Sequence, residues 1–179
     1  MSDLSFFREY LPTGIGRLVI LTDEQDRLRV ADWEDHAARM HRLLRLHYGT
    51  GRVSVTERSS RSEVWHRVSA YFSGELTAID GIAVATGGTG FQRSVWTALR
   101  KIPAGHTLSY RALATRLRCP KAVRAVGLAN GANPIGVVVP CHRIIGSDGS
   151  LTGYGGGIER KRWLLDHEGV RLQLDAKLL

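Results

Sequence analysis

One of the two cysteines of this chain stands beside a candidate base. Cys141 lies in the run Pro140-Cys141-His142-Arg143. A cysteine attacks as its thiolate, and an unperturbed thiol has a pKa of about 8.5, so a reactive cysteine needs a group that removes or holds its proton. If the chain were extended through this run, the side chains of Cys141 and His142 would point to opposite faces. Their direct contact therefore requires a turn, and otherwise a water must bridge them.

A histidine that acts as a base needs an acid that orients it. Glu168 is the candidate that we favour among the few acids of the second half, and Asp148 is the other. Cysteine proteases bring a distant histidine to their thiol through the fold, so the adjacency of Cys141 and His142 argues mildly against a hydrolase. We interpret Cys119, the second cysteine, as a small buried side chain without a chemical role.

Neither the cysteines nor the histidines indicate a metal site. Two cysteines are too few for a disulfide framework or a cysteine-built zinc site, and a reducing compartment would keep both as thiols. Four histidines occur in the first half, at spacings that do not place them on one helix face: His36, His41, His47 and His66. We therefore expect no metal and no cofactor.

The chain carries no segment of the membrane type. Its longest apolar stretches, such as residues 135–140, fall far short of the ~20 residues that a membrane helix needs. Residues 1–10 contain acids and an arginine but no long apolar segment, so we expect no secretory signal. These observations predict a soluble cytoplasmic protein without a membrane partner.

The net charge of +8 comes entirely from the second half of the chain. Residues 1–88 hold 11 Lys and Arg against 12 Asp and Glu, whereas residues 89–179 hold 14 against 5. Between Asp80 and Asp148 there is no acid, and nine basic residues occur there: Arg93, Arg100, Lys101, Arg111, Arg116, Arg118, Lys121, Arg124 and Arg143. Surfaces kept only for solubility usually mix both signs. The segment therefore predicts a polyanionic partner, with nucleic acid favoured over a merely solvated surface.

The sequence of the first half predicts both strands and helices, as in an α/β domain. Residues 15–22 and 28–33 are apolar strand candidates separated by the polar turn 23–26, which predicts a hairpin. Residues 36–48 and 62–73 have the spacing of amphipathic helices. A glycine-rich connector, Thr86-Gly87-Gly88-Thr89-Gly90, follows. We therefore predict two domains, one at residues 1–86 and the other at 87–179.

The second half contains a helix, a short turn and a second helix. An earlier helix has an apolar face and ends before Pro103: Phe91, Val95, Trp96 and Leu99. Ser109 can cap a helix at residues 110–117, and a further helix at 121–130 follows the turn at Cys119-Pro120. This order is typical of a DNA-reading unit. The small residues of the second helix suit close packing against a helix or a groove, and Lys121 and Arg124 at its start favour the groove.

The segment that carries Cys141 reads as a buried strand followed by loops and a last helix. Residues 135–139 form an apolar run that would deliver Cys141 at its end. A turn is expected at 147–150, a flexible glycine loop at 153–157, and a helix at 158–168 closed by Gly169.

Taken together, these motifs resemble the O6-alkylguanine-DNA alkyltransferases, the methylated-DNA–protein-cysteine methyltransferases, in their stand-alone bacterial-type form. The resemblance is close over about residues 86–170 and looser before them. Its motifs are Phe91-Gln92, Ile102-Pro103, Ser109-Tyr110, Arg124-Ala125-Val126-Gly127, Asn133-Pro134, Pro140-Cys141-His142-Arg143, Gly153-Tyr154-Gly155-Gly156-Gly157, Lys161-Arg162-Trp163-Leu164-Leu165 and His167-Glu168-Gly169. It implies an α/β ribonuclease-H-like N-terminal domain and a mostly α C-terminal winged helix-turn-helix domain.

The resemblance also implies catalytic roles. Glu168 would orient His142, which would deprotonate Cys141 through a water, and the thiolate would take the alkyl group of O6-alkylguanine in a single turnover that inactivates the protein. Tyr110 would assist the departure of guanine by donating toward its N3, and Asn133 would brace the turn between the recognition helix and the active site. The substrate pocket would include Pro140, Tyr154 and Gly155. Activity on O4-alkylthymine stays open.

The implied partner is double-stranded DNA that contains O6-alkylguanine. In the family, the helix that corresponds to residues 121–130 enters the minor groove, which assigns DNA contacts to Lys121, Arg124, Ala125 and Tyr110. Arg124 would fill the gap left by the extruded base, because the O6 substituent cannot meet a buried thiol inside a stacked duplex. We expect a monomer and leave cooperative binding along DNA open.

The sequence departs from the family's pattern at two places, and two alternative functions stay open. Gly155 stands where some relatives have serine, which suggests a roomier pocket and tolerance of alkyl groups larger than methyl. Cysteines with which some relatives bind zinc are absent here. The main alternative is a DNA damage-recognition or regulatory protein of the same fold without alkyl transfer, although relatives of that kind replace the cysteine. The second is a cysteine hydrolase.

Overall fold

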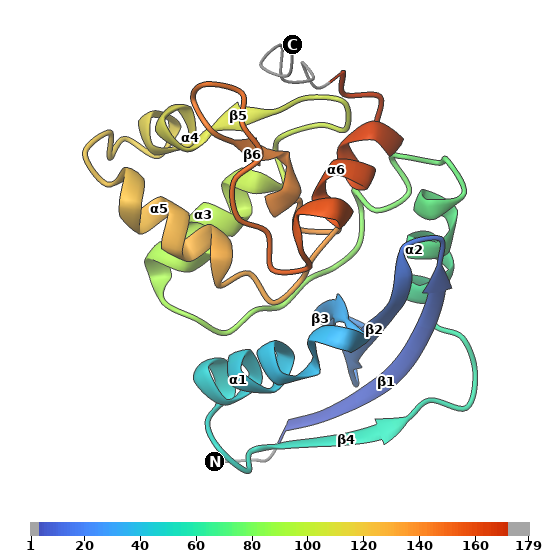
Figure 1. Ribbon diagram of the computed structural model, residues 1–179. Coiled ribbons are helices and arrows are strands. Elements are labelled where there is room, and N and C mark those ends of the chain that lie inside the picture. Colours follow the sequence, from blue (N-terminus) through green and yellow to red (C-terminus); the bar gives the residue numbers. More distant parts are fainter. Residues whose placement is uncertain (1–3, 172–179) are drawn as a thin grey trace.

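The computed structural model describes residues 4–171, and its first half is built on a four-stranded mixed sheet (Figure 1). The strands are β1 (Leu4–Thr13), β2 (Gly16–Asp23), β3 (Leu28–Trp33) and β4 (Val53–Glu57). Their order across the sheet is β3-β2-β1-β4, in which β1, β2 and β3 are antiparallel neighbours and β4 runs parallel to β1. The predicted hairpin is confirmed as β2–β3, whereas β1 and β4 were not predicted.

Both faces of this sheet are covered, which explains why residues 18–21 of β2 are apolar without interruption. Successive side chains of a strand point to opposite faces. Val19 and Leu21 accordingly pack with Met40 in a small cluster on one face, while Leu18 and Ile20 belong to the larger core on the other.

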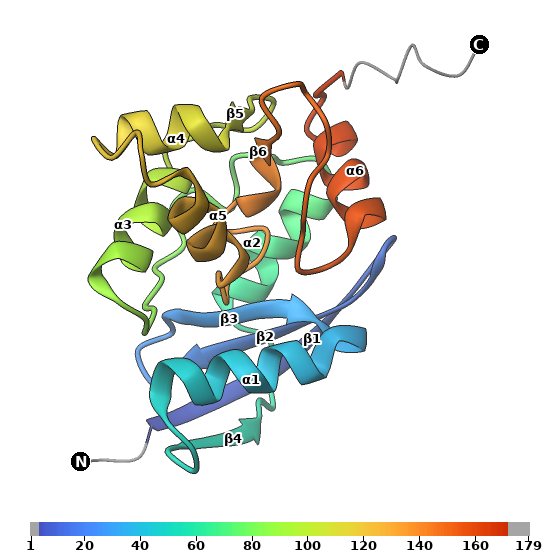
Figure 2. The same cartoon turned by 60° about the vertical axis from the view of Figure 1, so that its left-hand side comes forward.

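The first half also contains a short 3-10 turn and two helices: η1 (Glu34–His36), α1 (Ala37–Tyr48) and α2 (Glu63–Phe72). Both helices lie close to their predicted positions. In Figure 2, α1 lies along one face of the sheet and α2 lies on the other side, with the second half of the chain. Ser62 caps α2 by accepting from the backbone N–H of Trp65, and Val64, Val68 and Tyr71 are buried.

The second half is mostly helical. Its elements are α3 (Gly90–Leu99), β5 (Leu108–Ser109), α4 (Tyr110–Arg116), α5 (Val123–Gly131), η2 (Cys141–Arg143), β6 (Ile144–Ile145) and α6 (Ile158–His167). Thr89 and Gln92 form a capping box on α3, and Ser109 caps α4 as predicted by accepting from the N–H of Ala112. α5 packs against both α3 and α4, and β5 and β6 form a small parallel ladder.

Two helix predictions need adjustment. α5 begins at Val123, so Lys121 lies in the turn before it rather than in its first turn. The side chain of Phe91 is 38% exposed, so the buried face of α3 consists of Val95, Trp96 and Leu99 alone.

The predicted strand at residues 135–139 is wrong. Ile135 makes one isolated bridge to Ala31 of β3, and the chain then folds into tight turns in which Val139 N–H donates to the Ile135 carbonyl over 3.0 Å. Val137 even adopts a left-handed conformation, with φ of 69°. The segment is apolar because the larger core surrounds it, and not because it pairs in a sheet.

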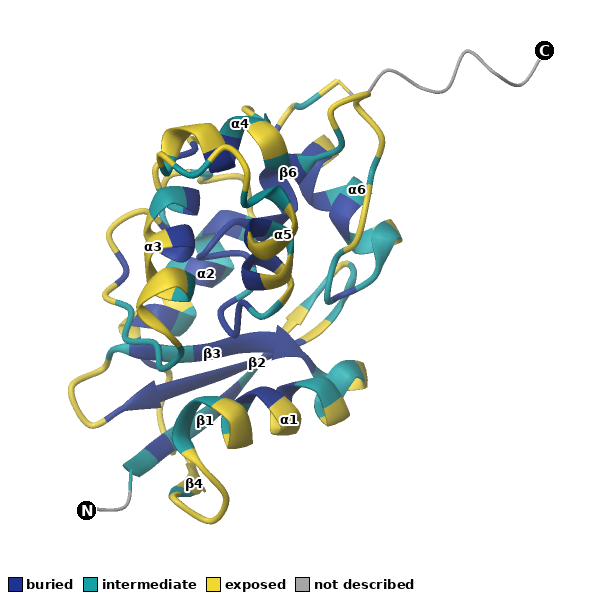
Figure 3. Ribbon diagram, turned by 90° about the vertical axis from the view of Figure 1, so that its left-hand side faces the viewer, coloured by how far each residue is buried: buried dark blue, intermediate teal, exposed yellow. Residues whose placement is uncertain are grey.

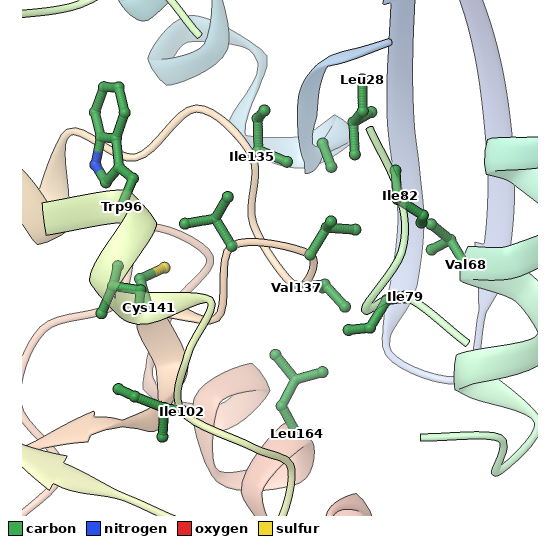
Figure 4. Close-up of a cluster of buried hydrophobic side chains, with 14 of the residues drawn as sticks. Leu28, Val68, Ile79, Ile82, Trp96, Ile102, Ile135, Val137, Cys141 and Leu164 are labelled. Carbon is green, nitrogen blue, oxygen red and sulfur yellow. The ribbon is translucent and has the colours of Figure 1, made fainter. Parts of the chain in front are cut away.

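The larger core is shared by the two halves of the chain. Figure 4 shows Leu28, Val68 and Ile82 of the first half facing Ile135 and Val137 of the second. In Figure 3 the buried sides of α2, α3 and α5 accordingly point toward this shared interior, whereas the buried side of α1 faces the small cluster on the other face of the sheet. The predicted division at 86/87 falls between α2 and α3 and stays a prediction, as do its outer limits, since residues 1–3 and 172–179 lie outside the described residues. No helix within residues 4–171 is long and apolar enough to cross a membrane.

Candidate active site

Cys141 begins the 3-10 turn η2 and is only 6% exposed. Its backbone N–H donates to the carbonyl of Val139 over 2.8 Å. The buried side chain of Asn133 holds the same loop, because its Nδ2 donates to the carbonyl of Val139 over 2.8 Å and its Oδ1 accepts from the N–H of Ile135 over 2.9 Å. Asn133 therefore fixes both ends of the turns that lead to Cys141, and Pro140 is buried between them.

His142 is fully buried and points one ring nitrogen at Glu168. Its Nε2 lies 2.9 Å from Oε1 of Glu168. Nδ1, the other nitrogen, has no hydrogen-bond partner among residues 4–171. A carboxylate accepts and does not donate, so the ring proton belongs on Nε2 and the lone pair on Nδ1. Burial lowers the pKa of His142 despite the opposing effect of Glu168, which favours the neutral ring.

Glu168 accepts hydrogen bonds on both carboxylate oxygens. Arg143 donates from Nε to Oε2 over 2.9 Å and from Nη2 to Oε1 over 2.8 Å. The Tyr71 hydroxyl donates to Oε1 over 2.7 Å. Burial alone would raise the pKa of Glu168, but the hydrogen bonds and charges of His142 and Arg143 outweigh it and hold that pKa far below its usual value. Glu168 is therefore an ionised carboxylate inside the protein.

The thiol of Cys141 has a different electrostatic balance. Burial raises its pKa, while a hydrogen bond from Asn133 and the positive charges of Arg39 and Lys161 act in the opposite direction. Because the net direction is upward, the resting side chain is a protonated thiol near neutral pH. Any reaction of Cys141 then requires a base that takes its proton, and His142 is adjacent in the chain.

A cavity of about 230 Å³ opens beside Cys141. Its lining comes from α4, α5 and the glycine loop: Tyr110, Gly127, Asn130, Gly131, Cys141, Gly153, Tyr154 and Gly155. A more open cleft of about 470 Å³ adjoins it and shares Tyr110 and Gly127 with it. The remaining residues of this cleft are Arg111, Val123, Arg124, Leu128, Ser147 and Thr152. Tyr110 and Gly127 thus stand between an outer groove and the thiol.

The predicted DNA contacts lie on the outside of this arrangement. Arg124 and Ala125 are exposed on α5, and Lys121 is exposed in the turn before it. Arg143, which we counted with the basic surface, is 2% exposed and holds Glu168 instead. Asp148, the alternative partner for His142, is exposed and bonds Ser150. Cys119 is half-buried and packs against the larger core.

The first half contributes side chains to the site that we did not predict. Arg39 of α1 donates to the carbonyls of Gly131 and Asn133 over 3.0 Å each, and it pairs with Asp32. A Cβ atom added at Gly155 would lie 2.5 Å from the Arg39 guanidinium. The space that we expected Gly155 to leave for a larger alkyl group is therefore occupied on that side by Arg39.

Gly156 shows why this loop is rich in glycine. A Cβ there would lie 2.4 Å from the indole of Trp33, so only glycine permits the close approach of the loop to β3. Trp33, Arg39 and Tyr71 all belong to the first half, and their sequence neighbourhoods carry no chemical motif. Of the missed residues only Arg143 had a signal, since it stands two positions after Cys141.

The chain is similar to one family of known proteins over most of its length. Residues 90–170 match the family described as the DNA-binding domain of 6-O-methylguanine DNA methyltransferase. A methylated-DNA–protein-cysteine methyltransferase of Salmonella typhimurium is 51% identical over 172 residues, which cover 94% of this chain and 99% of that protein. One of Methanosarcina mazei is 41% identical over 89% of this chain and 87% of its own. The crystal structure of Mycobacterium tuberculosis OGT in complex with DNA superposes with a TM-score of 0.76 at 38% identity, over 91% of this chain and 93% of the other.

Proposed function

This chain belongs to the methylated-DNA–protein-cysteine methyltransferases, and we propose that it repairs DNA by transferring the alkyl group of O6-alkylguanine to its own Cys141. One observation carries the choice of Cys141. Its thiol lies in a small cavity next to the buried His142–Glu168 pair, and the same cavity adjoins the exposed basic end of α5. The cavity thus adjoins both the thiol and the outer cleft, and the residue after the thiol is the proposed base.

The proposed reaction is a single displacement at the alkyl carbon. Nδ1 of His142 takes the proton of Cys141 through a bridging water, and Glu168 stabilises the imidazolium that forms. The sulfur then forms a bond to the alkyl carbon while the bond from that carbon to guanine O6 breaks, and its electron pair passes to guanine. Tyr110 donates its proton to guanine N3, and solvent carries the proton held by His142 to the tyrosinate, so that guanine leaves neutral and both side chains return to their starting state. The thioether is a poor leaving group, so each protein acts once.

We further propose that α5 enters the minor groove of double-stranded DNA. Arg124 would occupy the gap left by the extruded guanine, with Lys121 and Ala125 beside the backbone. The cavity beyond Tyr110 and Gly127 then receives the base, with Pro140, Tyr154 and Gly155 around it. The position of Tyr110 on both the groove and the cavity supports this path.

The finer architecture is part of the same proposal. The mixed sheet with α1 and α2 supports a ribonuclease-H-like first domain, and α4, α5 and the β5–β6 ladder support a winged helix-turn-helix in the second. We propose that the protein acts as a monomer that needs no metal.

A labelled substrate tests the function directly. Duplex DNA with O6-[methyl-³H]guanine is incubated with the protein and with its Cys141→Ala and Cys119→Ala variants. We expect at most one label per chain, absent from Cys141→Ala and unchanged in Cys119→Ala. Label released over many turnovers would identify a hydrolase instead. Binding of the damaged duplex without any transfer would identify a recognition protein.

A further inference from the structure

The hydroxyl of Tyr71 reaches the site from the first half of the chain. Tyr71 lies on α2, is 0% exposed and donates to Oε1 of Glu168 over 2.7 Å. The same oxygen lies 2.9 Å from Nε2 of His142. One carboxylate oxygen thus binds the proposed base and a side chain that is 97 residues away in the sequence.

A second contact fixes this arrangement. A ring nitrogen of His167, the neighbour of Glu168, lies 2.7 Å from the backbone carbonyl of Tyr71. The two rings also meet edge to face with their centroids 5.2 Å apart. Two adjacent residues at the end of α6 therefore hold one residue of α2, so the Tyr71 hydroxyl has little freedom to turn away from Glu168.

The phenol is a permanent donor. Burial raises the pKa of Tyr71 far above its usual value, and the negative charge of Glu168 raises it further. Oε1 of Glu168 accordingly accepts from Tyr71, from Arg143 and from His142. Each added donor withdraws charge from the carboxylate and weakens its pull on the imidazole proton.

We propose that Tyr71 is a positioning residue for alkyl transfer, which holds Oε1 of Glu168 toward His142 and sets the basicity of that histidine from the first half of the fold. This inference rests on the proposed function. It makes the contact between α2 and α6 part of the chemistry and more than a packing contact between two domains.

Removal of the Tyr71 hydroxyl should shift the pKa of His142 in a predictable direction. With one donor fewer, Glu168 holds more charge and stabilises imidazolium more, so the pKa of His142 rises. His142 must be neutral to accept the thiol proton, so the acid limb of the transfer rate moves to higher pH. A loss of packing alone would lower stability but would leave the midpoint of that limb in place.

The test measures the single-turnover transfer rate constant of Tyr71→Phe at saturating O6-methylguanine DNA across pH, together with DNA affinity. We expect a rate about three- to tenfold lower at neutral pH, an acid limb shifted upward by about half a pH unit, and unchanged affinity. The matched control is Tyr48→Phe, whose hydroxyl lies 3.5 Å from the carbonyl of Ala85 and should leave both quantities unchanged.

A second variant keeps the test decisive if Tyr71→Phe does not fold. Replacement of Tyr71 by 3-fluorotyrosine retains the ring and the hydroxyl but makes a stronger donor, which should move the acid limb downward. If the wild-type protein transfers the label but no folded variant shifts the acid limb of its pH profile, the role of Tyr71 is overturned. The proposed function then stays intact. Wild-type protein that takes up no label overturns the proposed function itself.

Discussion

The buried cluster around Glu168 and the exposed face of α5 use the same residue type in opposite ways. Arg143 and Arg124 both come from the acid-free segment of the second half. Arg143 is 2% exposed and donates to both oxygens of Glu168, whereas Arg124 stands exposed at the outer cleft. Burial therefore decides which arginine holds Glu168 and which is available for the proposed contact with DNA.

The two regions should respond differently to substitution. Breaking a buried ion pair by removing one partner costs roughly 3–5 kcal/mol, because a charge is left buried without compensation. An exposed cation that contacts phosphate contributes mainly to affinity and to its salt dependence. Changes in the cluster should thus reduce stability and transfer from any substrate, and changes on α5 should reduce DNA binding and transfer from duplex DNA but not transfer from the free base.

Glu168→Gln is expected to have the largest effect. The amide leaves the Arg143 guanidinium buried without a counter-charge and removes the stabilisation of His142. We expect transfer to fall by roughly 10²–10⁴-fold and stability by roughly 3–5 kcal/mol. Single-turnover labelling and urea unfolding measure the two losses. Asp148→Asn, at the exposed acid that was the alternative, is the control and should resemble the wild type. Near-normal transfer by Glu168→Gln would remove this acid from the chemistry.

Arg124→Ala should separate DNA binding from chemistry. We expect weaker binding to duplex DNA, with the salt slope of the affinity lower by about 1, and a loss of transfer from duplex DNA. Transfer from the free base O6-benzylguanine should stay at the wild-type rate, because no base has to be extruded. Arg116→Ala removes one exposed charge of α4 and is the control for net charge. If transfer from the free base falls as much as transfer from duplex DNA, Arg124 acts in the chemistry. The contrast between the buried cluster and the exposed face of α5 would then be wrong.

Acid should weaken the fold through the buried cluster. The pKa values of His142 and Glu168 are both lowered in the folded state, so the unfolded chain binds more protons as the pH falls. The stability tied to His142 is present above its usual pKa near 6.5 and is lost as the pH falls below it; the stability tied to Glu168 is lost below about 4.5.

Burial lowers the pKa of His47 as well, so the contribution of His142 is measured as the difference between the wild type and His142→Gln in urea unfolding between pH 7 and 5. Each such group can contribute a slope of at most about 1.4 kcal/mol per pH unit. His142→Gln should flatten this dependence, whereas a change at the exposed His106 should not. A fold whose stability rises toward pH 5 would contradict the assignment.

The sequence predicted which residues lie at the candidate site better than it predicted the side-chain contacts between distant segments. Cys141, His142 and Glu168 form local motifs, and the structure places Nε2 of His142 on Oε1 of Glu168. The caps at Ser109 and Gly169 and the β2–β3 hairpin also follow from local patterns. The caps and the hairpin depend on near neighbours, which periodicity and turn residues report. The pairing of His142 with Glu168 joins residues 26 apart, and it was expected because a histidine base needs an orienting acid.

Contacts between distant segments were not predictable in this way. Tyr71 was interpreted only as part of an apolar helix face, because no local pattern records that its hydroxyl meets Glu168. Arg39 similarly contacts carbonyls 92 and 94 residues away. The false strand at 135–139 has the same origin, since an apolar run reports burial and cannot distinguish a strand from turns packed inside a core.

Gly155→Ser is expected to have the smallest effect on transfer. A Cβ at this position would lie 2.5 Å from the Arg39 guanidinium, which Asp32 and the carbonyls of Gly131 and Asn133 hold, so we expect its displacement to cost about 1–3 kcal/mol in stability. Because Arg39 already fills this side, residue 155 should not set alkyl size, and the ratio of benzyl to methyl transfer should stay within about twofold of the wild type. A selective collapse of benzyl transfer in Gly155→Ser would show that the glycine does make room for the alkyl group. This edge of the cavity would then resemble the exposed face of α5, which has room for a ligand, more than the tightly packed cluster around Glu168.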